Sequence, residues 1–243
     1  MKTQTDALVL KVTDTGESDR LLTLFSPEYG VIRAFANGAK RMNSRLSCVS
    51  QSLTYGTYDL TLGKSGNTVT AGAEKQIFFE LRNDISKLAL SQYISSIIID
   101  TVGENEECGE LFRTVLNALY FLEKNLKPQS IIKSVIEIKA LCFSGYAPSL
   151  DCCPHCGITQ GSNMRFNIAE GSLYCENSGK KGELLTPGVL AAMRFICYAP
   201  VERIFSFTLS EKDETSLSFL TEKYLLYSLQ KEYKTLDFYK VML

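Results

Sequence analysis

Short apolar runs separated by turn-forming residues dominate the first third of the chain. Runs of this kind, bounded by Gly, Pro, Ser and Asn, are typical of β-strands. Residues 55–62 also alternate in polarity, with Tyr58, Leu60 and Leu62 on one face, as expected for a strand with one buried side. The predicted strands lie at residues 7–12, 20–25, 31–36, 55–62 and 68–75, with a hairpin loop at 63–67 and a longer loop at 37–52.

These five strands follow one another within the first 80 residues, which predicts a small closed barrel. The OB-fold is the five-stranded barrel that fits this pattern best. An SH3-like barrel would give similar local signals and stays open as an alternative. We therefore expect an OB-fold barrel at residues 1–80.

The period of the pattern changes after residue 80. Apolar positions recur there at helical spacing, with Asp84 or Ser86 as a cap before the first helix and Thr186-Pro187 before a later one. An irregular segment that bears Gly and Cys interrupts the helices at about 147–181. The predicted fold class is therefore α+β and multidomain, with the OB-fold β-barrel followed at 81–243 by an α-helical domain that carries a zinc-finger-like insertion. The predicted helices cover residues 88–98, 109–123, 129–145, 187–200 and 211–233.

Composition narrows the function classes. The chain has 243 residues and a formal net charge of −1, and its longest apolar stretches are far too short to cross a bilayer. Its first six residues are polar, which does not fit a signal peptide, so we expect a cytoplasmic protein that does not act at membranes. The sole histidine, His155, stands between two cysteines, and no phosphate-binding loop of the GxxxxGK[ST] type is present. A hydrolase or a nucleotide-driven motor is therefore disfavoured.

Eight cysteines remain to be explained. Cys48, Cys108, Cys142 and Cys197 are scattered singly and are interpreted as small buried apolar side chains. The other four lie together, and Cys153-Pro154-His155-Cys156-Gly157 has the form of a CPxCG metal knuckle. A partner knuckle is expected 15 to 20 residues later, and Cys175 follows after 18, but Ser178 stands where the fourth cysteine should be.

Three interpretations of the cysteine segment stay open. The first is a structural zinc site of Cys153, Cys156 and Cys175, completed by a substitute ligand for which His155 and Cys152 are nearby candidates. The second is the same loop without stable metal. The third is a thioredoxin-like redox pair, which is disfavoured because no strand leads into the CxxC sequence.

A locally basic stretch lies between Glu28 and Asp59, where no acidic residue occurs. It contains Arg33, Lys40, Arg41 and Arg45, and such a cluster is what a phosphate backbone requires. Three aromatic residues in or beside this stretch are candidates for stacking on bases, namely Phe35, Tyr55 and Tyr58. A solvated loop with core aromatics is the alternative interpretation. A weaker second cluster of Lys180, Lys181 and Arg194 is interpreted as solvated surface.

The sequence GESDRLLTLF at 16–25, followed by residues 30–33, 38–41 and 44–46, resembles the amino-terminal signature of the RecO family of recombination mediators. The sequence GYAPSL at 145–150, followed by Cys153 and Cys156-Gly157, resembles its central signature, and residues 236–238 fit its end. The resemblance covers essentially the whole chain.

This resemblance implies a protein that is not an enzyme. Family members have an amino-terminal OB-fold, a helical body and in many cases a zinc finger. They bind single- and double-stranded DNA, anneal complementary strands, and work with RecR to load RecA onto DNA coated by single-stranded DNA-binding protein, in the cytoplasm at the nucleoid. The resemblance assigns DNA contact to Arg33, Lys40, Arg41 and Arg45, and three of four zinc ligands to Cys153, Cys156 and Cys175, while Ser178 departs from the pattern.

Two other functions remain as alternatives. One is a zinc-stabilised OB-fold protein that binds RNA or serves as an assembly subunit. The other is a thiol oxidoreductase that uses Cys153 and Cys156. Strand annealing would distinguish a mediator from the first, and turnover with a dithiol substrate would support the second.

Overall fold

The computed structural model describes residues 1–63, 66–161 and 163–243. Its contacts divide the chain into two compact units, Met1–Glu123 with Thr235–Leu243, and Lys124–Lys234. The predicted boundary between residues 80 and 81 marks the change from strands to helices and stays a prediction. The predicted hairpin loop at 63–67 includes Lys64 and Ser65, which lie outside the described residues.

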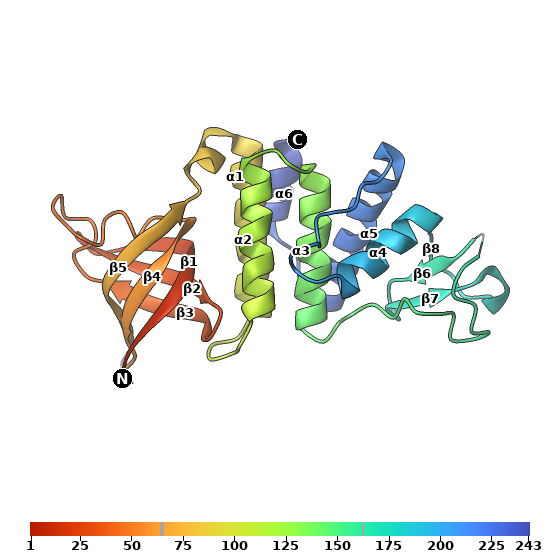
Figure 1. The fold of residues 1–243 in the computed structure, drawn as a ribbon, viewed down its shortest axis with the longest axis horizontal. Helices are drawn as coiled ribbons and strands as arrows, with labels where there is room; N and C mark the ends of the chain where they lie inside the picture. Colours follow the sequence, from red (N-terminus) through yellow and green to blue (C-terminus); the bar gives the residue numbers. More distant parts are fainter. Residues whose placement is uncertain (64–65, 162) are drawn as a thin grey trace. The chain divides into compact units, whose positions relative to one another are not determined.

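The first unit contains a closed barrel, which confirms the predicted OB-like architecture (Figure 1). Its strands pair in the order β1-β2-β3-β5-β4, and β1 also pairs with β4 to close the ring. All pairings are antiparallel except that of β3 with β5, where Ala34 lies opposite Asn67. Within the described residues the strands are β1 (Lys2–Thr15), β2 (Asp19–Ser26), β3 (Gly30–Ala36), β4 (Thr54–Thr61) and β5 (Asn67–Ile77).

The barrel interior is filled by alternate side chains of these strands. In β4, Thr54, Gly56, Tyr58 and Leu60 are buried and the residues between them are partly exposed, as the period of two predicts. The loop after β3 adds Ala39, Leu46 and Val49 to the same apolar cluster. This loop is therefore anchored to the barrel core along its length.

The helices of the first unit follow the barrel in sequence. They are η1 (Phe79–Asn83), α1 (Ile85–Thr101), α2 (Gly109–Glu123) and the C-terminal α6 (Lys234–Val241). Asp84 caps α1, since its carboxylate accepts hydrogen bonds from the backbone N–H groups of Ser86 and Lys87 at 3.0 and 3.1 Å. The ring of Phe112 in α2 meets Phe25 of β2 edge to face, with 5.3 Å between centroids, which joins helix and barrel through an apolar contact.

The second unit contains three longer helices and a small sheet. The helices are α3 (Gln129–Phe143), α4 (Pro187–Tyr198) and α5 (Glu211–Leu229). Between α3 and α4 lie β6 (Arg165–Asn167), β7 (Ser172–Tyr174), η2 (Glu176–Ser178) and β8 (Glu183–Leu184), and the strands pair in the order β7-β6-β8. No helix in the described part of the chain is long and apolar enough to span a bilayer.

The predicted helix at 211–233 is corrected by the structure. Helix α5 ends at Leu229, because Gln230 adopts a left-handed conformation with φ of 50°. The backbone N–H of Gln230 bonds to the carbonyls of Leu226 and Tyr227, which satisfies the helix end, and α6 then begins at Lys234.

A buried ionic cluster joins α3 to α5. The Lys133 ammonium group lies 3.0 Å from Glu137 Oε1 and 3.2 Å from Glu222 Oε2, and it donates to the Ser218 carbonyl at 2.9 Å. Thr221 donates to Glu137 at 2.6 Å. The Lys133 and Glu137 side chains are 3% and 0% exposed, so their charges depend on one another rather than on water.

Candidate nucleic-acid interface and metal centre

The strand β3 presents a cation and an aromatic ring on the outer face of the barrel. Ile32 and Ala34 point into the core, so Arg33 and Phe35 share the opposite face, and both are exposed. Asn67 donates its side-chain amide to the Arg33 carbonyl at 3.1 Å, which ties this part of β3 to the start of β5. Arg33 and Phe35 thus form a small surface that could contact both a phosphate and a base.

The loop at 37–53 carries the other three predicted cations. Lys40, Arg41 and Arg45 are all exposed. The loop folds as successive turns, in which the Arg41 N–H bonds to the Gly38 carbonyl at 3.1 Å and the Ser44 N–H to the Arg41 carbonyl at 3.0 Å. Together with its buried apolar residues, these turns order the backbone that carries the three cations.

Two acidic residues of the β1–β2 hairpin organise this loop. Asp14 lies 3.0 Å from Lys40 Nζ and 3.5 Å from Arg20 Nε. Asp19 accepts the backbone N–H of Gly38 at 2.7 Å. The hydrogen bond from Lys40 holds the pKa of Asp14 below its usual value, and the Gly38 N–H does the same for the pKa of Asp19. Lys40 is thus partly neutralised, whereas Arg33, Arg41 and Arg45 form no ion pair with the described residues.

The three predicted stacking aromatics have different environments. Tyr58 is fully buried and its hydroxyl donates to the Val49 carbonyl at 2.8 Å, so it is a core residue and not a candidate for stacking. Tyr55 is half-buried, with its ring 6.0 Å from that of Phe112. Phe35 is 38% exposed and is the member of the three that is open to a base.

The knuckle cysteines come together in the second unit. The sulfur atoms of Cys153, Cys156 and Cys175 all lie within 4.8 Å of one another, with 3.7 Å between Cys153 and Cys175 and 3.3 Å between Cys156 and Cys175. A metal bound tetrahedrally at the usual sulfur distance separates its thiolates by about 3.8 Å. The three thiols therefore fit three positions around one metal ion.

Backbone groups around Cys153 favour its thiolate. Burial raises the pKa of the thiol, but N–H groups of Cys175, His155 and Cys156 outweigh burial and lower the pKa to about 6. The left-handed φ of Gly157, 73°, permits the tight turn that aims such amides at sulfur. Three thiols in one cluster also favour a metal centre over an isolated redox pair.

The fourth position contains none of the predicted substitutes. The Ser178 hydroxyl donates to the Cys175 carbonyl at 2.7 Å and accepts the Lys180 N–H at 3.3 Å. In the described part of the chain, neither His155 nor Cys152 joins the three clustered cysteines.

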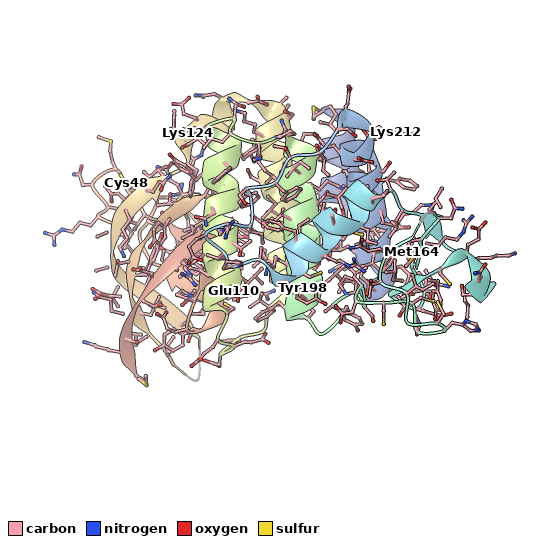
Figure 2. The ribbon with its side chains drawn as sticks, turned by 45° about the vertical axis from the view of Figure 1, so that its right-hand side comes forward. Cys48, Glu110, Lys124, Met164, Tyr198 and Lys212 are labelled. Carbon is pink, nitrogen blue, oxygen red and sulfur yellow. The ribbon has the colours of Figure 1, made fainter. Side chains whose placement is uncertain are left out.

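Arg194 fixes the ends of the knuckle loop, a role the sequence did not indicate. From α4 its guanidinium donates to the carbonyls of Leu150, Asp151 and Thr159 at 2.8, 3.0 and 2.6 Å. Tyr198, labelled in Figure 2 at the end of the same helix, donates to the Asp151 carboxylate at 3.0 Å. The interpretation of Arg194 as solvated surface was therefore wrong.

The scattered cysteines divide by environment. Cys108 is buried as expected, and Cys142 and Cys197 are half-buried. Cys48 is exposed on the loop after β3 (Figure 2), which corrects the expectation that it is a buried apolar side chain. That loop buries Leu46 and Val49 instead.

Comparison with known proteins finds relatives along nearly the whole chain. Residues 1–77 match the family described as "Recombination protein O N terminal", and residues 82–237 match "Recombination protein O C terminal". The chain is 33% identical over 242 residues to DNA repair protein RecO of Acetivibrio thermocellus, covering 98% of this chain and 96% of that protein. It is 30% identical over 207 residues to DNA repair protein RecO of Bacillus pumilus, covering 84% and 80%. It is 26% identical over 234 residues to DNA repair protein RecO of Caldicellulosiruptor saccharolyticus, covering 96% of each chain.

Proposed function

The chain belongs to the RecO family of DNA repair proteins, which are non-enzymatic recombination mediators, and from this premise we propose that it binds DNA through the barrel and anneals complementary strands. Annealing requires two phosphate backbones to be neutralised while they are brought together. A set of exposed cations supplies this neutralisation without any covalent step. Annealing therefore needs only charged, aromatic and hydrogen-bonding side chains, and no catalytic residue.

The DNA interface that we propose consists of Arg33, Lys40, Arg41 and Arg45, with Phe35 as the stacking residue. The observation that carries it is the shared outer face of Arg33 and Phe35, which places a cation beside an exposed ring. OB barrels bind single strands by this combination of a basic groove and aromatic platforms. The 37–53 loop adds three exposed cations on a backbone that its own turns order.

The partners follow from the family and are part of the proposal. We infer that the protein acts with RecR to load RecA onto DNA coated by single-stranded DNA-binding protein, in the cytoplasm at the nucleoid. The protein binds both single- and double-stranded DNA, because both carry the phosphate backbone that the cations neutralise.

We further propose that Cys153, Cys156 and Cys175 bind a structural zinc ion. When bound, the metal would cross-link an irregular segment that has little apolar core of its own. Residues of this chain prepare the site, since Arg194 fixes both ends of the first knuckle and backbone amides favour the Cys153 thiolate.

A charge-reversal experiment tests the DNA interface. Arg33→Glu, Lys40→Glu and Arg41→Glu in one chain should weaken binding to a labelled single strand in fluorescence anisotropy and make the slope of log affinity against log salt shallower by roughly 2. The matched control reverses Lys181, Lys212 and Lys223 in the other unit, which changes net charge equally. Equal losses in both variants would show that overall charge, and not this interface, governs binding.

A further inference from the structure

The second knuckle keeps its turn but lacks its fourth thiol. Gly179 has a left-handed φ of 67°, similar to the 73° of Gly157 in the first knuckle. The Ser178 N–H bonds to the Cys175 carbonyl at 3.2 Å, and the Ser178 hydroxyl is engaged with the Cys175 carbonyl and the Lys180 N–H. The backbone is therefore shaped for a ligand at 178, while its hydroxyl is hydrogen-bonded to the main chain.

One side of the cysteine cluster reaches the protein surface. Cys153 and Cys175 are buried, but Cys156 is exposed. A Cβ added at Gly157 or at Gly179 would meet no atom within 4 Å among those described, so both knuckle turns border open space. No other His, Cys, Asp or Glu of the described residues lies close enough to complete the cluster.

We propose that this centre is a three-thiolate metal site whose fourth coordination position accepts a small thiol from solution. The inference rests on the proposed metal site. A metal already bound by three thiolates is a soft centre and prefers a further sulfur donor to a serine hydroxyl. In the exchange the thiol releases its proton to solvent, its thiolate binds the metal and one water molecule leaves, with no change in oxidation state.

Cobalt(II) provides a direct test, because its sulfur-to-metal charge-transfer absorption reports the number of bound thiolates. The full chain, Ser178→Cys and Ser178→Ala are each loaded with cobalt and titrated with 2-mercaptoethanol. Before titration, the charge-transfer absorption of Ser178→Cys and that of the native chain should stand in a ratio of about 4:3, because four and three thiolates bind the metal. The added thiol should raise the charge-transfer absorption of the native chain and of Ser178→Ala to the level of Ser178→Cys, and it should shift their ligand-field bands. The spectrum of Ser178→Cys should not change.

Each contrary outcome identifies what has failed. A native chain that binds cobalt but does not respond to thiol would overturn the open position and leave the metal site intact. Loss of the native spectrum in Ser178→Ala would make the serine a ligand. Dimerisation on cobalt loading, detected by sedimentation, would show that a second copy supplies the fourth ligand. A native chain that binds neither cobalt nor zinc, while Ser178→Cys binds both, would overturn the metal site as well.

Discussion

Asp14 and Lys40 form an ion pair of 3.0 Å between the β1–β2 hairpin and the basic loop. One acidic side chain thus reduces the charge of the surface that we propose for DNA. DNA must therefore compete with Asp14 for Lys40.

We therefore predict that Asp14→Asn increases affinity for single-stranded DNA. Water and salt screen an exposed ion pair, so we expect the gain in affinity to be small. Release of Lys40 should also steepen the salt slope by about 0.7. The control is Glu183→Gln, which breaks a similarly exposed pair with Lys223 at 3.1 Å. Weaker binding by Asp14→Asn would mean that the pair orders the loop more than it masks charge.

Phe35→Ala is predicted to affect single strands more than duplexes. Stacking on an aromatic ring contributes about 1–3 kcal/mol per base, and the bases of a duplex are already stacked on one another. Anisotropy with single- and double-stranded oligonucleotides of equal length measures the difference. Tyr120→Ala, which removes an aromatic residue that is 43% exposed on α2, is the matched control. Equal losses of affinity for single- and double-stranded DNA would show that Phe35 does not stack on bases.

Arg194→Met should lower metal affinity by about 10- to 100-fold, the range found for residues that orient metal ligands. It deletes all three bonds to the knuckle carbonyls, whereas Tyr198→Phe deletes a single bond to Asp151 and should have a smaller effect. Competition with a chromophoric zinc chelator gives the affinities, and far-ultraviolet circular dichroism reports whether α4 is retained. An unchanged affinity in Arg194→Met would show that the knuckle holds its shape without this clamp.

The buried Lys133 is predicted to be a large determinant of stability. Lys133→Met removes the ammonium group shared by Glu137 and Glu222, and breaking a buried pair in this way costs about 3–5 kcal/mol. Urea denaturation measures the free energy of unfolding. Lys223→Met, at an exposed pair, should cost about 1 kcal/mol or less. Similar costs for the two variants would contradict the burial argument.

Local patterns predicted much of the fold because the position of each strand or helix depends mainly on residues close to it in the sequence. Alternation and turn residues located the barrel strands, and Asp84 and Thr186 marked helix starts that the structure confirms. The burial of Tyr58 could also be predicted from the alternation of β4, since Tyr58 shares a face with Leu60. The end of α5 at Gln230 had no Gly or Pro to mark it.

Long-range hydrogen bonds could not be predicted in the same way. Arg194 bonds to carbonyls 35 to 44 residues away, and backbone acceptors leave no signature in a sequence. The spacing of Cys153, Cys156 and Cys175 did predict their cluster, because the ligands of metal knuckles have characteristic spacings in the sequence. The hydrogen bonding of Ser178 to the main chain required the coordinates.

Annealing of complementary oligonucleotides, each coated beforehand with single-stranded DNA-binding protein, tests the central claim most directly. At moderate salt the native protein should accelerate annealing, and the Arg33→Glu, Lys40→Glu, Arg41→Glu chain should lose most of that acceleration while retaining its fold. A folded native protein that binds the bare strands but leaves the annealing rate of coated strands unchanged would contradict a mediator function.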